Sequence, residues 1–244
     1  MPAIARDDLE ALLRHRKLDH TLITAAGPDQ PRWLVPTGIA DLDARLDGGI
    51  PRGHLSEIVG PRSSGRLTVT VSALAAATWR GEAVALIDPL DMFDPVSAAH
   101  HIDFQRMLWV RGEACSASRV SLSCEYGTLQ KSLDRAVKAL NIVLQAGGFG
   151  LVVLDLGEMS ARAVKRLPYA TWLRLHRVIE GSETACVLIG SEPIARSAGG
   201  VSVLLTTPHA RSLKSEADCS ARVVRARARE TDRDVCLSLS APAC

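Results

Sequence analysis

Four short runs of apolar residues, separated by longer helical patterns, constrain the fold of this chain more than any other feature. The runs are EAVALID, RMLWV, GLVVLDL and ACVLIGS, at residues 82–88, 106–110, 150–156 and 185–191. Each is almost free of polar residues, which is typical of strands buried on both faces of a parallel sheet. Between the second and third runs, leucine and valine recur at three- and four-residue spacing, as they do in an amphipathic helix. We therefore expect an α/β fold with a mostly parallel central sheet flanked by helices.

The two ends of the chain depart from this pattern. Residues 7–18 predict a short N-terminal helix, with Leu9, Leu12 and Leu13 near one face and acidic residues at its start. A connector rich in proline and glycine follows, so we predict an N-terminal helix and linker at 1–30 and one core domain at 31–244. The helix either packs on its own domain or docks onto a neighbouring molecule. Near the C-terminus, alternation on both sides of ETDRD predicts an antiparallel hairpin at the sheet edge.

Composition restricts the class of protein. With 47% hydrophobic and 23% charged residues in 244, the chain can bury a core. Its net charge of +2 gives no overall preference for nucleic acid. We expect no membrane association and no signal peptide, because no apolar run approaches ~20 residues and the N-terminus lacks an apolar segment. The six cysteines form no C-x-x-C pair, so we expect reduced thiols, no metal site and a cytoplasmic location.

The segment EIVGPRSSGRLT, residues 57–68, has the glycine spacing of a phosphate-binding loop between a strand and a helix. Gly60 and Gly65 fit G-x-x-x-x-G-K-[ST], but Arg66 and Leu67 stand where the motif has lysine and a hydroxyl residue. Leu67 removes the hydroxyl that would bind Mg²⁺, and one further step along a helix turns Thr68 away by ~100°. The loop can still hold an anion at the helix N-terminus, whereas hydrolysis of Mg–ATP is not expected.

A longer stretch around this loop resembles the core of the bacterial RecA recombinases. It runs from VPTGIADLDARLDGGIPRG through the loop to ALIDPLDMFDPV, about residues 35–98, and continues more thinly through GLVVLDL and ACVLIGS. The family has a Ser-Thr-Gly entry, a Gly-Gly-Leu-Pro-x-Gly turn, a G-P-E-S-S-G-K-T loop and a strand that ends I-D-A-E-H-A-L-D-P. The resemblance implies a RecA-like P-loop core. It also places Asp155 at the metal-facing end of the family's second acidic strand.

The departures from the family fall on residues that carry chemistry. The resemblance places Leu90 at the catalytic glutamate and Gly190-Ser191 at the nucleotide-sensing Asn-Gln, in addition to the changes at Arg66 and Leu67. Because leucine cannot orient a water, we expect a scaffold without turnover, no catalytic residue and no cofactor, with ATP or phosphate as the weak alternative. The degenerate nucleotide or anion site comprises Gly60, Ser63, Ser64, Gly65, Arg66, Thr68 and Asp155.

Several charged residues have two interpretations. Arg66 is either a phosphate clamp or the partner of Asp88 or Asp155 in a salt bridge that fills the site. We interpret Asp155 and Asp88 as structural acids at strand ends, with metal binding by Asp155 or catalysis by Asp88 as the alternatives. Arg222, Arg225, Arg227 and Arg229 are possible DNA-binding residues, but no aromatic residue for stacking lies nearby, so a solvated strand face is preferred.

The second half of the chain, with RMLWVRG and GLVVLDL, also resembles the ImuA proteins, RecA-related accessory factors of SOS-induced translesion synthesis. This resemblance implies a non-hydrolysing accessory protein of the DNA damage response. Its implied partners are RecA, an ImuB-like translesion polymerase subunit, or both, with DNA contact weak or indirect. Leu9, Leu12 and Leu13 are the candidate partner-binding residues. The alternatives are a DNA-dependent ATPase or recombinase, and a switch that binds ATP without cleaving it.

Overall fold

The computed structural model describes residues 33–112, 126–195, 199–206, 218–226 and 233–238. The chain divides into two compact units, Met1–Arg32 and Trp33–Cys244, and all the described residues belong to the second unit. The predicted N-terminal helix with Leu9, Leu12 and Leu13 lies outside the described residues. The domain boundary at residue 30 stays a prediction.

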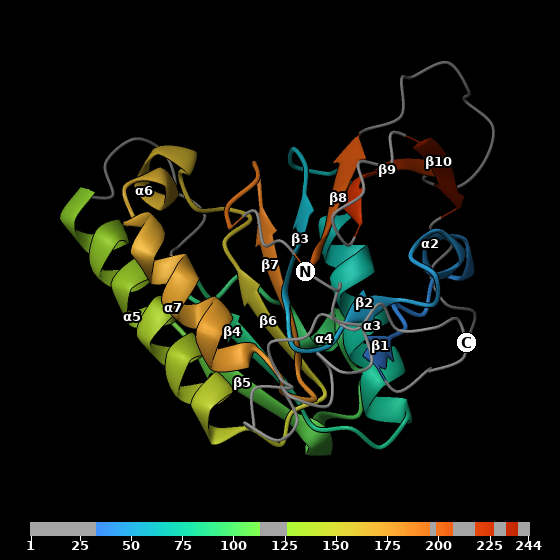
Figure 1. Ribbon diagram of the computed structural model, residues 1–244, viewed down its shortest axis with the longest axis horizontal. Helices are drawn as coiled ribbons and strands as arrows, with labels where there is room; N and C mark the ends of the chain where they lie inside the picture. The colour runs from blue at the N-terminus through green and yellow to red at the C-terminus, as the bar shows by residue number, and fades with distance from the viewer. Residues whose placement is uncertain (1–32, 113–125, 196–198, 207–217, 227–232, 239–244) are drawn as a thin grey trace, which may run out of the picture. The chain divides into compact units, whose positions relative to one another are not determined.

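A sheet of eight strands, counted over the described residues, forms the centre of this unit (Figure 1). Its order is β10-β9-β8-β3-β7-β6-β4-β5. The strands are β3 (Leu55–Val59), β4 (Val84–Asp88), β5 (Met107–Arg111), β6 (Leu151–Asp155), β7 (Ala185–Gly190), β8 (Val201–Thr206), β9 (Asp218–Ala226) and β10 (Arg233–Ser238). The strands from β8 to β5 are parallel, and β9 and β10 are antiparallel. The mostly parallel sheet and the C-terminal hairpin are thereby confirmed.

Helices connect the strands. They are α2 (Ala40–Arg45), α3 (Arg66–Trp79), α4 (Pro95–Ala98), α5 (Tyr126–Ala146), α6 (Ala161–Lys165) and α7 (Tyr169–Ile179), with a 3₁₀ turn η3 at Phe104–Arg106. A separate two-stranded antiparallel ladder joins β1 (Leu34–Val35) to β2 (Ile50–Pro51). None of the helices in the described part of the chain combines the length and the apolar character that a bilayer crossing demands.

Two hydrophobic cores lie on opposite faces of the sheet, because alternate residues of each strand point to opposite sides. On one face, Val84 and Leu86 of β4 pack with the small residues of α3. On the other face, Ala85 and Ile87 pack with α5 and α7. Ala73 and Ala77 of α3 are buried, so this helix approaches the sheet closely. The near-continuous apolar strands are explained by these two cores.

The topology brings several strand ends to one place. In a parallel sheet the carboxyl ends of the strands share an edge, and ligands bind in the crevice outside that edge, where the strand order switches. Here β3 and β4 are consecutive along the chain but are separated in the sheet by β7 and β6. The loop after β3 and the residues after β6 and β7 therefore lie together at this edge of the sheet.

Candidate nucleotide and anion site

The loop between β3 and α3 keeps a backbone that only glycine permits at key points. Gly65 caps α3 in the left-handed conformation, with φ +90°. A Cβ on Gly60 would lie 2.5 Å from the Leu205 carbonyl oxygen and 2.6 Å from Ser64 Oγ. The Gly60 N–H donates to the Gly190 carbonyl at 3.1 Å, which ties the loop to the end of β7. The glycine positions of the motif therefore serve the loop geometry that the sequence predicted.

Arg66 reaches from the first turn of α3 across the site to the segment after β6. Its side chain is buried, at 7% exposure for the residue. Nη1 donates to the Gly157 carbonyl at 2.9 Å, and Nη2 donates to Glu158 Oε1 at 3.2 Å. The sequence left two interpretations of Arg66 open, a phosphate clamp or a salt bridge to Asp88 or Asp155. The structure has an ion pair from Arg66, but its partner is Glu158 and not either of those acids.

Glu158 lies between two guanidinium groups. Its other carboxylate oxygen, Oε2, forms an ion pair with Arg62, an exposed residue of the loop. The hydrogen bond and the charge of Glu158 raise the pKa of Arg62 further above its ordinary value, so Arg62 stays charged. Two arginines beside each other are also side chains that bind a phosphate group. Glu158 therefore supplies, from within the chain, the negative charge that these two arginines attract.

Asp155, at the end of β6, is a buried acid bonded to backbone. Its Oδ1 accepts a hydrogen bond from the Gly157 N–H at 2.8 Å. Burial raises the pKa of Asp155 to about 6; the charges of Asp88 and Glu158 add to the rise, while the Gly157 N–H and Arg66 oppose it. The carboxyl therefore gains a proton much more readily than an ordinary aspartate.

Asp88, at the end of β4, closes the turn that follows it. Its two carboxylate oxygens accept hydrogen bonds from the N–H groups of Met92 at 3.0 Å and Phe93 at 2.9 Å. These are the bonds expected of a structural acid at a strand end. Both acids of the site are thus engaged with backbone groups, as their structural interpretation requires.

Two of the positions that differ from the RecA family, Leu90 and Leu67, carry apolar side chains that cannot bind water or a metal ion. Leu90 is 4% exposed and packs in the core beneath α5 and α7. Leu67 is 53% exposed, on the outer side of α3. Thr68 is half-buried, and Ser64 is buried beneath the loop. Within the described residues no group of three or more His, Cys, Asp or Glu side chains is suited to hold a metal ion.

The structure adds three residues that the sequence did not single out: Arg62, Glu158 and Glu57. Glu57 is a buried acid in the middle of β3, and it accepts hydrogen bonds from the N–H groups of Ile194, at 2.9 Å, and Ala195. It thereby anchors the segment after β7 to the central strand. Glu158 could have been noticed in the sequence, because it follows Asp155 by three residues. Its pairing with Arg66 could not, because that contact depends on the order of the strands in the sheet.

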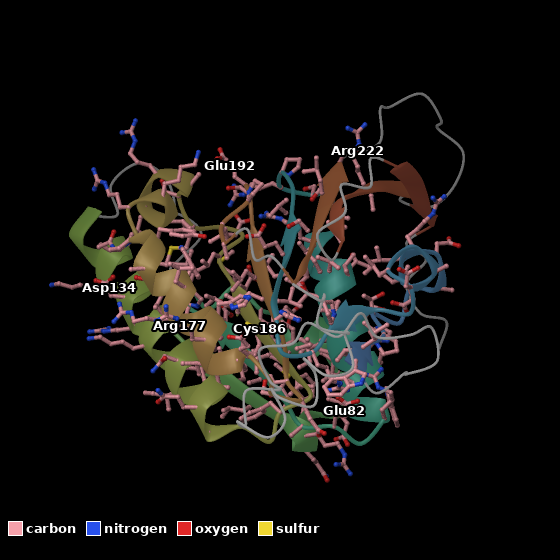
Figure 2. The ribbon with its side chains drawn as sticks, in the orientation of Figure 1. Glu82, Asp134, Arg177, Cys186, Glu192 and Arg222 are labelled. Carbon is pink, nitrogen blue, oxygen red and sulfur yellow. The ribbon has the colours of Figure 1, made fainter. Side chains whose placement is uncertain are left out.

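The predicted arginine stripe is described only in part. Arg222 lies in β9, opposite Leu204 of β8 and Asp234 of β10, and is half-buried (Figure 2). A bulge between Ser202 and Val203 interrupts the ladder that Arg225 joins. Arg227 and Arg229 lie outside the described residues. A DNA-binding role for this stripe stays a prediction.

Comparison with known families agrees with this architecture. Residues 29–115 match the RecA N-terminal domain. The chain has a RecA-like core. It is 28% identical over 204 residues to Protein RecA of Thermus thermophilus, an alignment that covers 77% of this chain and 54% of that protein. It is 29% identical over 209 residues to Protein RecA of Ruminococcus albus, covering 78% and 47% of the two chains.

A shorter alignment is closer in sequence. It gives 32% identity over 127 residues to Protein RecA of Nocardia farcinica and covers 52% of this chain and 32% of the relative. The chain thus spans between about a third and about half of the length of these three relatives. It shares with them the fold of the RecA-like core.

Proposed function

We propose that this chain is a non-hydrolysing RecA-like accessory protein of the SOS response to DNA damage. It acts in translesion synthesis through protein contacts with RecA, with an ImuB-like translesion polymerase subunit, or with both. The observation that carries the proposal is the buried side chain of Arg66, which is bonded to Gly157 and Glu158 across the site. The RecA-like core supplies the frame for a partner that recognises a RecA-shaped surface.

The contacts of Arg66 oppose nucleotide turnover. A working loop needs a cation that is free to follow the phosphoryl group as charge develops in the transition state. The guanidinium of Arg66 must first leave two protein oxygens, and its planar fork does not replace a compact ammonium group. Leu67 offers no ligand to Mg²⁺, and Leu90 is fixed in a core. At these three positions the chain therefore holds residues that cannot perform the step that the RecA family assigns to them.

The proposed mechanism is recognition of shape. A chain with a RecA-like core can occupy the place of a recombinase subunit without the cycle of hydrolysis that would release it. The N-terminal residues Leu9, Leu12 and Leu13 are the proposed docking element for the partner. Removal of residues 1–20 should abolish capture of RecA or of the polymerase subunit while the melting temperature of the core is kept.

Phosphate release in the presence of single-stranded DNA tests the absence of turnover. The intact chain should release no phosphate above the buffer blank, under conditions in which a RecA protein assayed in parallel is active. The Arg66→Ala variant should behave like the intact chain. Robust turnover that Arg66→Ala destroys would overturn the proposal in favour of a DNA-dependent ATPase.

A second candidate is a switch that binds ATP without cleaving it. It is favoured by the intact glycine geometry of the loop and by the α3 N-terminus beneath it. If ATP binds the folded chain, a concentration of ~100 times Kd adds ~2.7 kcal/mol to its stability. A thermal shift measured with ATP and EDTA, where no metal is available, separates the two candidates: ATP should raise the melting temperature if the chain is a switch and leave it unchanged if it is not.

A further inference from the structure

The outer helices α5, α6 and α7 carry a marked excess of positive charge. They contain seven basic residues and one acidic residue, Asp134. The basic residues are Lys131, Arg135, Lys138, Arg162, Lys165, Arg174 and Arg177, all exposed. These helices therefore carry +6, although the whole chain carries only +2, so the remainder carries −4. Positive charge is concentrated on one layer of the core.

The charges lie on the outward sides of two helices that pack against each other. On α5, Lys131, Arg135 and Lys138 recur at spacings of four and three residues, opposite the buried Leu133 and Leu140. On α7, Arg174 and Arg177 lie opposite the buried Trp172 and Leu175. Because α5 contacts both α6 and α7, these outward sides form one surface, which we call the basic face. Figure 2 shows it at the left, with Asp134 and Arg177 labelled.

Only part of the charge on the basic face stabilises its own helices: Arg177 lies in the last turn of α7, where a cation complements the helix dipole. Like charges three or four residues apart, such as Lys131 with Arg135 and Arg174 with Arg177, destabilise a helix. Lys165 is paired with Glu192. Lys131, Lys138, Arg174 and Arg177 form no ion pair with any residue that the structure describes. The positive charge that these four residues leave unpaired makes the surface complementary to an oppositely charged partner.

Apolar side chains are interleaved with these charges. Ile142 is 65% exposed and follows Lys138 by one turn of α5. Tyr169 and Leu173, at 61% and 46% exposure, precede Arg177 on the same stripe of α7 at four-residue intervals. Exposed aliphatic side chains make no favourable contact with the phosphate backbone of a nucleic acid. A protein interface, in contrast, combines aromatic and aliphatic anchors with arginine.

We infer that the basic face binds an acidic amphipathic segment of a partner protein. Carboxylates of the segment would pair with Lys138, Arg174 and Arg177, and its apolar stripe would cover Ile142 and Leu173. The inference rests on the proposed function in one respect, that the ligand is a protein. It adds the surface and the chemistry of the partner.

The probe is a fluorescein-labelled 18-residue peptide of glutamate, alanine and leucine, with leucine on one helical face. The full chain should bind it, and Arg177→Glu should weaken binding by at least 10-fold. The matched control is Arg45→Glu, the same charge reversal at an exposed position of α2, which should leave binding unchanged. Equal effects of the two substitutions, or no binding to the intact chain, would overturn the inference.

A second pair of measurements separates protein from nucleic acid. The double variant Ile142→Ser, Leu173→Ser should lose at least 5-fold in peptide affinity and keep its affinity for a 20-nucleotide oligothymidylate. If the oligonucleotide binds more tightly than the peptide and the serine changes have no effect, the face is a nucleic-acid surface and the inference is wrong. Circular dichroism melts of each variant verify that the exposed substitutions leave the fold intact.

Capture experiments distinguish this inference from the proposed function. If the intact chain captures neither RecA nor the polymerase subunit while the peptide results hold, the proposed function fails and the basic face stands. If the intact chain captures RecA or the polymerase subunit but does not bind the peptide, the inference fails and the proposed function stands.

Discussion

Arg66 and Glu158 form an ion pair, 3.2 Å from Nη2 to Oε1, that joins the first residue of α3 to the segment after β6. The pair spans the gap between the β3–α3 loop and the end of β6, the strand that carries Asp155. Arg66 is 8% exposed and Glu158 22% exposed as side chains, so water screens the pair only in part. The two arginines of the loop and of the first turn of α3, Arg62 and Arg66, are thus both paired with one carboxylate of the same chain.

The first prediction concerns the removal of that carboxylate. Glu158→Ala leaves a buried guanidinium without its counter-charge, so it should destabilise the fold by ~1–3 kcal/mol. Inorganic phosphate should then restore part of the lost stability, because it can take the place of the carboxylate between Arg62 and Arg66. Urea denaturation with and without 50 mM phosphate measures both effects.

Glu192→Ala is the control for this experiment. It removes a carboxylate from the exposed pair with Lys165, for which about 1 kcal/mol or less is expected. Phosphate should have no specific effect on it. An equal response of the two variants to phosphate would mean that Glu158 does not occupy an anion site.

The second prediction concerns Asp155 and pH. Its pKa in the folded chain is about 6, above the ordinary 3.8, so the folded state holds a proton that the unfolded state releases. Stability is therefore fully present below about pH 4 as far as this group is concerned, and it falls as the pH rises through 6. The difference between the two pKa values corresponds to ~3 kcal/mol at most.

Asp155→Asn should remove this pH dependence, because an amide oxygen still accepts the Gly157 N–H and never ionises. We expect the variant to be more stable than the intact chain at pH 8, and by only about half as much at pH 5, which lies between the two pKa values. Asp94→Asn provides the opposite case, since hydrogen bonds from Ser97 and Val96 lower the pKa of Asp94. Denaturation curves at the two pH values measure the free energy of unfolding of each variant. A larger gain in stability for Asp155→Asn at pH 5 than at pH 8 would contradict a raised pKa for Asp155.

The fold was largely predictable because its signals are local. A strand buried on both faces must be apolar throughout, so residues 150–156 and 185–191 could be recognised alone as β6 and β7. The C-terminal hairpin was predicted from alternation around a polar turn. Strand order carries no such local signal: that β7 and β6 separate β3 from β4 follows from crossover connections and packing.

The site could be predicted only where it depends on one segment. The glycines of the loop are spaced within six residues, so Gly60 and Gly65 were found from sequence. The contact between Arg66 and Glu158 joins positions 92 residues apart and depends on which strands are neighbours. A list of acids near strand ends therefore included Asp88 and Asp155, which bond to backbone, and omitted the residue that pairs with Arg66.

The third prediction compares two glycines of the site. Gly60→Ala would place a Cβ 2.5 Å from the backbone oxygen of Leu205, so β8 or the loop must shift. Gly157→Ala would meet the tips of two side chains instead, Arg66 Nη1 at 2.9 Å and Asp155 Oδ1 at 3.0 Å, which can move more easily. We expect a loss of ~2 kcal/mol or more for Gly60→Ala, and a smaller loss for Gly157→Ala. Thermal denaturation measures the order; the reverse order would be inconsistent with the described loop.

The last prediction tests which side of α5 supports the core. Leu140 is fully buried, in contact with the strands that carry Ala85 and Val152, while Ile142 on the same helix is 65% exposed. Leu140→Ala removes buried methyl groups and leaves a cavity, so it should cost ~2–5 kcal/mol in the free energy of unfolding. Ile142→Ala should cost within about 0.5 kcal/mol, because its side chain loses little contact and alanine favours a helix. Equal losses in urea denaturation would mean that the basic face is covered by the chain itself, since a side chain must be buried for its truncation to leave a cavity.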